Sequence, residues 1–313
     1  DISEKRKAMI RQKAKEMGYL PNMAARALKT KMTHNIGVLF IDDYHSGLTH
    51  PYFAPVLESL KTEVENLGYD ITFINKNVGG REMSYLEHCR YRNVDGVVIA
   101  NVDFTKEEVV ELVESDIPVV TIDHVFNNCL AVVSDNIKGI RELTEYVISM
   151  GHKKIAYIHG QQNSVTKVRL ASFYRTMEEH GLTVPDEYVP EAPYLEAEAS
   201  AEATKKLLAL KNPPTCILYP DDYTAIGGIA VIREAGLSIP SDISVAGYDG
   251  ISLIQQFLPK LTTYAQDMSG IGKAAAQAIV DQIERPKSAL VELIVKAGAV
   301  MPGASVRCLN ENE

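Results

Sequence analysis

The 313-residue sequence has no tryptophan, and it has no apolar run of about 18 residues, the length that a membrane-spanning helix needs. We therefore expect no membrane partner, and any ring stacking on a ligand must use phenylalanine, tyrosine or histidine. Cysteine is scarce, and its four residues are far apart with no CxxC pair: Cys89, Cys129, Cys216 and Cys308. This pattern indicates buried, reduced thiols of a cytoplasmic protein and predicts no metal site and no cofactor.

Signatures of common enzyme classes are also missing. No G-x-G-x-x-G follows a predicted strand, and there is no G-x-x-x-x-G-K-[ST], no G-x-S-x-G nucleophile turn and no H-E-x-x-H. Asp221 and Asp222 form a carboxylate pair, but no base or set of metal ligands accompanies them in the sequence. We therefore expect that the protein is not an enzyme.

Charge is distributed unevenly along the chain. Residues 1–34 hold nine lysines and arginines against three acids, a net charge of +6, which leaves −15 to the rest because the whole chain carries −9. A basic head on an acidic body suits a polyanionic partner at one end. An exposed amphipathic helix without a partner would show the same pattern, and charge alone leaves both interpretations open.

The basic head is predicted to contain a helix. Ser3 can cap its N-terminus, Ile10, Ala14 and Met17 form one apolar stripe, and Gly18 ends it. One helix of this length cannot bury a core, so we expect the chain to begin inside a small domain. The sequence has no signal-peptide pattern at this end.

A second, shorter helix is predicted at residues 22–29, with Asn22 as its cap. A helix of about two turns is marginal in water and would form only when docked on a partner. Residues 30–34 are then a linker.

From residue 35 onward, apolar strands alternate with amphipathic helices, which predicts an α/β fold of two doubly wound parallel-sheet lobes. In the first lobe we predict strands at 36–41, 71–75, 96–100 and 119–123 and helices at 53–67, 83–92 and 106–115. In the second lobe we predict strands at 155–159, 215–219 and 244–248 and helices at 169–180, 197–210 and 223–235. Two similar lobes suggest a ligand cleft between them.

Several short motifs follow one another in order along the chain. They are GYLPNMAARAL at 18–28, VDGVV at 94–98, SDN at 134–136, GHKKIA at 151–156, GLSIPSDISVAGYD at 236–249 and LTT at 261–263. Together they resemble the LacI/GalR family of bacterial repressors almost from end to end. The resemblance implies a periplasmic-binding-protein-like effector domain, preceded by the remnant of a helix-turn-helix domain, and a homodimer.

For the basic head, the resemblance implies contacts with operator DNA. Residues 2–17 resemble the third helix of the helix-turn-helix domain, and residues 22–29 resemble the hinge helix that enters the minor groove. The residues expected to contact DNA are Asn22, Ala25, Arg26, Leu28 and Lys29. Leu28 matches a leucine that wedges between base pairs, although it could instead pack on a partner chain. Because the base-reading helix is absent from the sequence, we expect only weak, salt-sensitive DNA binding.

For the cleft, the resemblance implies an effector site with eight residues. Six are polar and would hydrogen-bond the effector, and Phe53 and Tyr194 would form apolar walls. The polar ones are Asp123, His124, Arg169, Asp221, Asp249 and Gln266. Alternatives remain for some of them: Arg169 could form a surface ion pair, Asp249 could stabilise a turn, and His124 could be an ordinary surface or core histidine.

Two neighbouring aspartates are expected to have structural roles. Asp135 is predicted to brace the crossover between the lobes, and Asp222 is predicted to cap the helix that starts at Tyr223.

The predicted chemistry of the site favours a sugar or sugar derivative as the effector. Carboxylates, an arginine and a glutamine beside aromatic walls suit a polyol. Asn163 stands where purine sensors of the family have an arginine, which disfavours a purine, whereas Asp221 stands where many sugar sensors have an asparagine.

The predicted domains are residues 1–34 for the DNA-binding remnant, hinge and linker, 35–134 with 264–291 for the first lobe, and 135–263 with 292–309 for the second. An extracytoplasmic sugar-binding protein of a transporter would share the two-lobe fold and is the alternative function.

Overall fold

The computed structural model describes residues 3–19, 32–42, 46–256 and 258–310. The predicted hinge helix and its DNA-contacting residues (Asn22, Ala25, Arg26, Leu28 and Lys29) lie outside the described residues. The first predicted helix is present as α1 (Glu4–Glu16), but Ser3 makes no side-chain capping bond and no residue of the helix is buried. Ile10 and Met17 of its predicted apolar stripe are exposed.

The first lobe is built on a six-stranded, entirely parallel sheet in the order β12-β7-β6-β5-β1-β2. In the centre of the sheet, Val38 of β1 lies opposite Phe73 of β2 and Val98 of β5. The strands are β1 (Asn35–Phe40), β2 (Asp70–Ile74), β5 (Gly96–Asn101), β6 (Val119–Ile122), β7 (Leu130–Ser134) and β12 (Leu293–Lys296).

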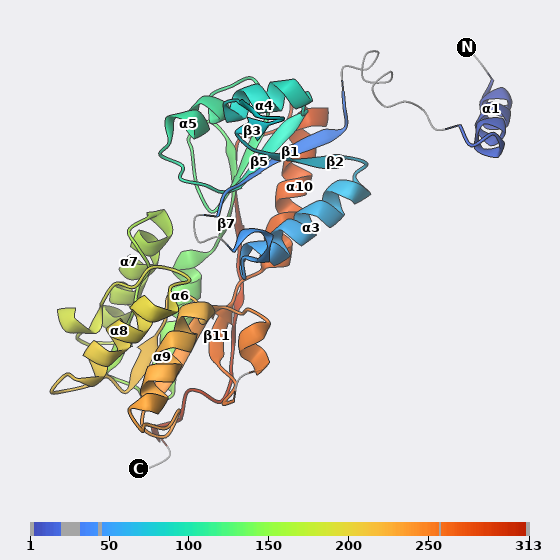
Figure 1. The fold of residues 1–313 in the computed structure, drawn as a ribbon. Helices are drawn as coiled ribbons and strands as arrows, with labels where there is room; N and C mark the ends of the chain where they lie inside the picture. Colours follow the sequence, from blue (N-terminus) through green and yellow to red (C-terminus); the bar gives the residue numbers. More distant parts are fainter. Residues whose placement is uncertain (1–2, 20–31, 43–45, 257, 311–313) are drawn as a thin grey trace.

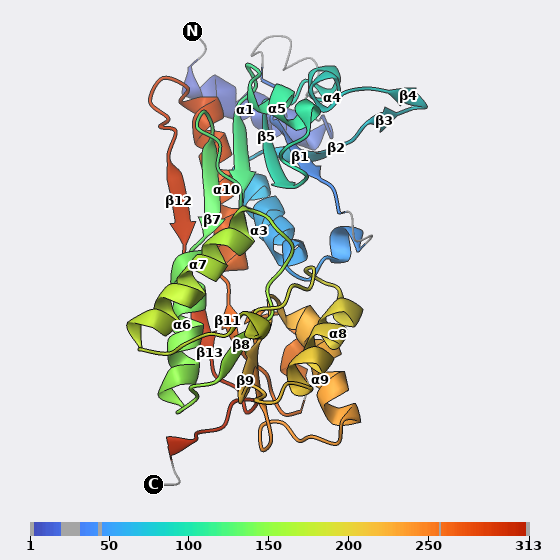
Figure 2. The ribbon, with the colours of Figure 1, turned by 90° about the vertical axis from the view of Figure 1, so that its left-hand side faces the viewer.

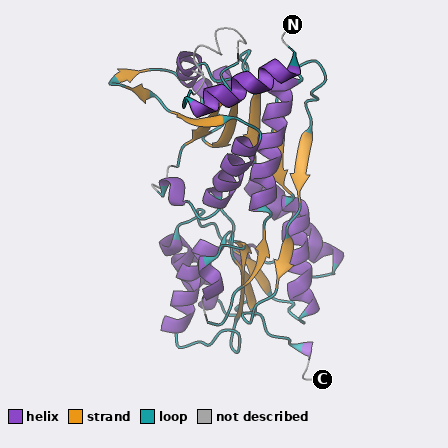
Figure 3. Ribbon diagram, turned by 90° about the vertical axis from the view of Figure 1, so that its right-hand side faces the viewer, coloured by secondary structure: helices purple, strands orange, loops and turns teal. Residues whose placement is uncertain are grey.

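Helices cover both faces of this sheet (Figures 1 and 3). Strand residues such as Val98 share a core with α3 (Phe53–Asn66) and α10 (Met268–Glu284) on one face. Their neighbours Val97 and Ile99 face α4 (Tyr85–Arg92) and α5 (Glu107–Val113) on the other face. This alternation explains why the strands are apolar throughout. A hairpin of β3 (Asn77–Val78) and β4 (Arg81–Glu82) extends from the lobe (Figure 2).

The second lobe has a five-stranded sheet in the order β13-β11-β10-β9-β8, in which only the pairing of β13 with β11 is antiparallel. One face packs on α6 and α7, and the other packs on α8 and α9. The strands are β8 (Ile155–Tyr157), β9 (Cys216–Leu218), β10 (Ser244–Asp249), β11 (Thr262–Ala265) and β13 (Ala299–Met301). The helices are α6 (Asn136–Ser149), α7 (Ser164–Glu179), α8 (Ala197–Leu208) and α9 (Asp222–Glu234).

The chain passes between the lobes three times, and two of the predicted boundaries are wrong. Tyr264 pairs with β10, so the second lobe continues to the end of β11 and does not stop at residue 263. Strand β12 pairs with β7, so the first lobe continues through Lys296 and does not stop at residue 291. The predicted first crossover is correct, because β7 ends at Ser134 in the first sheet and α6 starts at Asn136 in the second lobe.

The strands and helices predicted for the two lobes are confirmed to within a few residues at their ends, with one larger difference. Helix α7 starts at Ser164, five residues before the predicted start at Arg169, and Asn163 caps it by accepting a hydrogen bond from the Thr166 N–H at 2.8 Å. Arg169 therefore lies in the second turn of the helix.

Candidate effector-binding site

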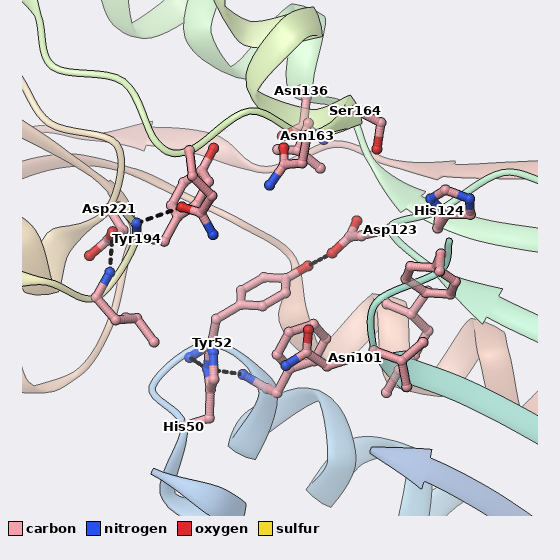
Figure 4. A pocket seen from close by; sticks show the side chains of 18 of the residues that line it. His50, Tyr52, Asn101, Asp123, His124, Asn136, Asn163, Ser164, Tyr194 and Asp221 are labelled. Atoms are coloured by element: carbon pink, nitrogen blue, oxygen red, sulfur yellow. Dashed lines mark hydrogen bonds between the residues drawn. The ribbon is translucent and has the colours of Figure 1, made fainter. Parts of the chain in front are cut away.

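A cavity of about 420 Å³ lies between the two lobes (Figure 4). All eight residues that the sequence assigns to effector binding line it: Phe53, Asp123, His124, Arg169, Tyr194, Asp221, Asp249 and Gln266. The structure therefore brings the predicted set together around one space. Whether these residues hold an effector stays a prediction.

On the first-lobe side, Asp123 is bonded to two elements. Its Oδ2 accepts a hydrogen bond from the Tyr52 hydroxyl at 2.6 Å, and its Oδ1 accepts one from the Ser134 N–H at 3.0 Å. The backbone of Asp123 is left-handed, with φ of 57°, which is strained for a residue other than glycine. Burial raises the pKa of the Asp123 carboxyl, although the bonds from Tyr52 and Ser134 oppose the shift.

His50 lies just before helix α3, beside the cavity. Its Nδ1 accepts hydrogen bonds from the backbone N–H groups of Tyr52 and Phe53, each at 3.2 Å. Burial lowers the pKa of His50, which keeps the ring neutral and its Nδ1 able to accept. Phe53 packs edge-on against His50 and Phe40, so the aromatic wall is held in place.

Arg169 is the buried cation on the second-lobe side. Its Nε donates to Asn136 Oδ1 at 2.7 Å, and its Nη1 donates to the Pro220 carbonyl at 3.0 Å. The guanidinium lies over the Tyr248 ring, with its Cζ 3.7 Å from the ring centroid. Within the described residues it forms no ion pair, which argues against the surface-ion-pair alternative. The two bonds use two of its five N–H groups, so three remain for a ligand.

Asp249 and Gln266 form a bonded pair next to Arg169. Gln266 Nε2 donates to Asp249 Oδ1 at 2.6 Å. Gln266 Oε1 is buried and has no hydrogen-bond partner in the structure. Burial raises the pKa of Asp249 well above its usual range, and the charge of Arg169 opposes the shift. A donor on a ligand would satisfy the unpaired oxygen of Gln266.

The predicted roles of Asp221 and Asp222 are partly wrong. Asp221, not Asp222, caps helix α9, because its Oδ1 accepts from the Thr224 N–H at 2.8 Å while its Oδ2 accepts from the Leu195 N–H at 3.1 Å. Asp222 is the first helical residue and points behind the cavity. Asp221 thus lines the cavity with both oxygens already bonded to backbone.

Asp222 instead anchors the loop after β10. Its Oδ2 accepts from the N–H groups of Gly250 and Ile251 at 2.7 and 2.9 Å, and its Oδ1 accepts from the Thr263 hydroxyl at 2.6 Å. Burial raises the pKa of Asp222 to about 7, although the three donors oppose the shift.

Asp135 and Tyr194 are held by their own neighbours. Asp135 caps α6 by accepting from the Lys138 N–H at 3.0 Å, and its own N–H donates to the Lys296 carbonyl at 2.8 Å, so it braces the crossover as predicted. The Tyr194 hydroxyl lies 2.9 Å from Thr166 Oγ1. Figure 4 shows Tyr194 and Asp221 at one end of the cavity and His124 at the other.

Several cavity residues were not predicted from the sequence. Asn136 lies in the motif at 134–136 and Tyr52 adjoins Phe53, so two of them lie next to recognised signals. The others lie in loops or at the ends of elements, where the sequence carries no distinctive pattern. They include His50, Asn101, Phe104, Gln161 and Ser164.

The described part of the chain shows no group of three or more histidines, cysteines, aspartates or glutamates able to hold a metal ion. No helix in these same residues is long and apolar enough to cross a membrane.

Comparison with known proteins identifies the class of domain to which the two lobes belong. A model of the periplasmic binding protein-like domain matches residues 144–306, which agrees with two lobes around a cleft. The HTH-type transcriptional repressor PurR of Pectobacterium atrosepticum is 31% identical over 288 residues, covering 90% of this chain and 83% of the repressor. The chain belongs to the LacI/GalR family of transcriptional regulators.

Solved structures agree on the fold. A putative LacI transcriptional regulator from Bacillus cereus subsp. cytotoxis superposes with a TM-score of 0.77 at 23% identity, covering 87% of this chain and 97% of that one. A LacI family regulator from Enterococcus faecium with bound ribose gives a TM-score of 0.75 at 24% identity, covering 88% and 99%. At these identities the likeness concerns the fold alone.

Proposed function

We propose that this regulator binds a neutral sugar or sugar derivative in the interlobe cavity and thereby controls its binding to operator DNA. The proposal includes a homodimer that acts in the cytoplasm, with the segment at residues 22–29 as the hinge between effector domain and DNA. The bound ribose of the Enterococcus faecium structure is compatible with such a ligand in this fold.

The observation that carries the proposal is the balance of polar groups around the cavity. Three carboxylates, those of Asp123, Asp221 and Asp249, line it together with one arginine, Arg169. A neutral sugar can use this set of groups whether the three acids are ionised or protonated, because its hydroxyls can donate to a carboxylate, accept from a protonated carboxyl and accept from Arg169. An anionic ligand would find an opposite charge only at Arg169. The unpaired oxygen of Gln266 adds one more acceptor.

The same residues suggest how binding would act on the lobes. Asp123 and Phe53 belong to the first lobe, Arg169 and Asp249 to the second, and Gln266 to a crossover. A ligand that contacts all three parts stabilises the relative lobe positions in which every contact is made, and so shifts their population. A helix of about two turns, which the sequence predicts for residues 22–29, would have little stability of its own, so a shift of a few kcal/mol would be enough to fold or melt it.

The test is a thermal-shift screen against neutral sugars, sugar phosphates, nucleobases and amino acids. We expect a neutral sugar to raise the melting temperature, since it binds the folded state. Asp249→Asn should abolish most of that increase, because it replaces a carboxyl oxygen that can accept from a sugar hydroxyl with an amide NH2 group that cannot. Asp116→Asn is the matched control, because Asp116 is an exposed aspartate paired with Arg90 on the first lobe.

The screen separates the proposal from its competitors. Stabilisation by a nucleobase alone would contradict a sugar effector, and stabilisation by sugar phosphates in preference to neutral sugars would contradict the charge argument. A transporter's binding protein, the alternative function, would also bind a sugar. It is less well supported, because the PurR relatives that cover most of the chain are transcriptional repressors.

A further inference from the structure

The two ends of the cavity differ in chemistry. Arg169 lies toward one end, because its guanidinium carbon is 5.9 Å from the centroid of the Tyr194 ring, which Figure 4 shows at the end opposite His124. Asp249, which interacts with Arg169, and its bonded partner Gln266 make this end polar. At the other end, the rings of Phe104 and His124 stack in parallel, with centroids 4.1 Å apart and an angle of 5° between their planes. Phe126 packs edge-on against both rings. We call Phe104 and His124 the aromatic shelf.

The shelf is fixed by the loops that carry it. Phe104 follows β5 and His124 follows β6, and these parallel neighbours end at the same edge of the sheet. The Phe104 loop is held by Asp103, whose Oδ1 accepts from the Thr105 N–H at 3.0 Å and from its hydroxyl at 2.6 Å. The Thr121 hydroxyl donates to the His124 carbonyl at 2.6 Å. The aromatic rings are therefore positioned before any ligand arrives.

The Phe104 ring also packs against the first-lobe core that includes α4 and α5, so packing accounts for only part of its surface. Both rings of the shelf are only half-buried and both line the cavity. Burial lowers the pKa of His124, so the imidazole is neutral near pH 7 and presents an uncharged flat face. Figure 4 shows Ser164 and Asn163, from the start of α7, on the opposite wall near His124. These side chains add polar groups at the edge of an otherwise apolar surface.

The volume of the cavity exceeds the needs of one sugar ring. A hexose occupies about 190 Å³ when packed as in an organic crystal, whereas the cavity measures about 420 Å³. One ring at the polar end would leave the aromatic shelf uncovered, and two linked rings would reach both ends.

We propose that the effector is a neutral disaccharide: one ring is held at the polar end by Arg169, Asp249 and Gln266, and the second lies with its C–H face on the Phe104–His124 shelf. This inference rests on the proposed function and specifies its ligand. Sugar rings have one face of C–H groups and a rim of hydroxyls, so the flat shelf takes the face while Asn163 and Ser164 are placed for the rim.

Isothermal titration calorimetry on the full chain tests the inference with matched pairs of sugars. The pairs are glucose with maltose and cellobiose, galactose with lactose and melibiose, and xylose with xylobiose. We expect at least one disaccharide to bind the wild type about tenfold or more tightly than its monosaccharide. In Phe104→Ala and in His124→Ala that advantage should fall about tenfold, while the monosaccharide affinity changes less than twofold. His180→Ala, at an exposed histidine that ends α7, is the control and should change neither affinity.

Each other outcome overturns the inference in a recognisable way. If monosaccharides bind as tightly as their disaccharides, or if the shelf variants weaken the binding of both kinds of sugar equally, a subsite for a second ring would be refuted while the proposed sugar-sensor function would stand. Phenyl β-glucoside is titrated alongside glucose as a further pair, and a gain confined to it would show that the shelf takes an aromatic group and not a sugar. No binding by any carbohydrate would overturn the disaccharide and the proposed function together.

Discussion

Substituting Asp222 by asparagine should change how the stability of the protein depends on pH. Asp222 is fully buried and its pKa is raised to about 7. In the unfolded chain an aspartate titrates near about 3.9. The folded state therefore holds this proton more tightly than the unfolded state. The stability that Asp222 contributes is complete below the unfolded pKa and is lost as the pH rises through the folded pKa.

The magnitude follows from the two pKa values. With a folded pKa of about 7, the free energy of unfolding should fall by about 2 kcal/mol between pH 5.5 and pH 8 through this one group. The asparagine in Asp222→Asn does not titrate, so the difference in the free energy of unfolding between wild type and variant should shrink by that amount over the same pH range. The asparagine can keep the local geometry, because its oxygen can face the Gly250 and Ile251 N–H groups while its amide faces the Thr263 hydroxyl.

Urea denaturation of both proteins at pH 5.5 and pH 8 measures this difference. Asp221 and Asp249 also have raised pKa values, so the wild type will show a steeper total dependence, and most of their contribution cancels in the comparison. Parallel stability curves, differing by a constant within about 0.5 kcal/mol, would refute the reasoning. That result would mean that the three donors keep Asp222 ionised throughout the range.

Two further predictions concern the cavity and the helix packing. For the carbohydrate that gives the largest thermal shift, Arg169→Ala should weaken the affinity measured by calorimetry by about 100-fold, because about two charged hydrogen bonds are lost. Arg175→Ala, on the exposed face of the same helix, should change that affinity less than twofold. Equal affinities of the two variants would remove Arg169 from the site. Gly272→Ala should lower the free energy of unfolding, measured by urea denaturation, by about 3 kcal/mol, because its Cβ would lie 2.2 Å from the Val56 backbone oxygen of α3. The control is Lys273→Ala on the same helix. Equal stability of the two variants would show that α3 and α10 can separate at little cost.

The sequence predicted most of the strands because each is a continuous apolar run, and such runs are characteristic of strands buried on both faces of a parallel sheet. It did not place α10, which is rich in glycine and alanine. Gly272 lies against the α3 backbone, and five of the nine buried residues of the helix are glycine or alanine, so its buried face carries few of the large apolar side chains that mark an amphipathic helix in a sequence. It also placed β12 in the wrong lobe, because nothing local to a short edge strand specifies which sheet it joins.

The site was predicted from motifs, and the errors within it concern positions along the chain. Asp221 and Asp222 both suit a helix cap, and only the backbone distinguishes them: Asp221 is extended, with φ of −153° and ψ of 166°, whereas Asp222 is already helical. A shift of one residue decides which carboxylate lies beside the cavity and which lies behind it. The start of α7 was missed for a similar reason, because its first turn is mostly polar and the cap is Asn163.

The hydrogen bonds of the cavity residues suggest why this site can act as a sensor. Asp123 of the first lobe accepts a hydrogen bond from Ser134, and Arg169 of the second lobe donates one to Asn136. Each lobe therefore has a cavity residue that is bonded directly to the first crossover. Gln266, on the second crossover, holds Asp249. A ligand that competes for these donors and acceptors changes the bonds that fix the connections between lobes. How far the ligand shifts the balance between two relative positions of the lobes then depends on the difference between its binding free energies for those positions, however tightly it binds either one.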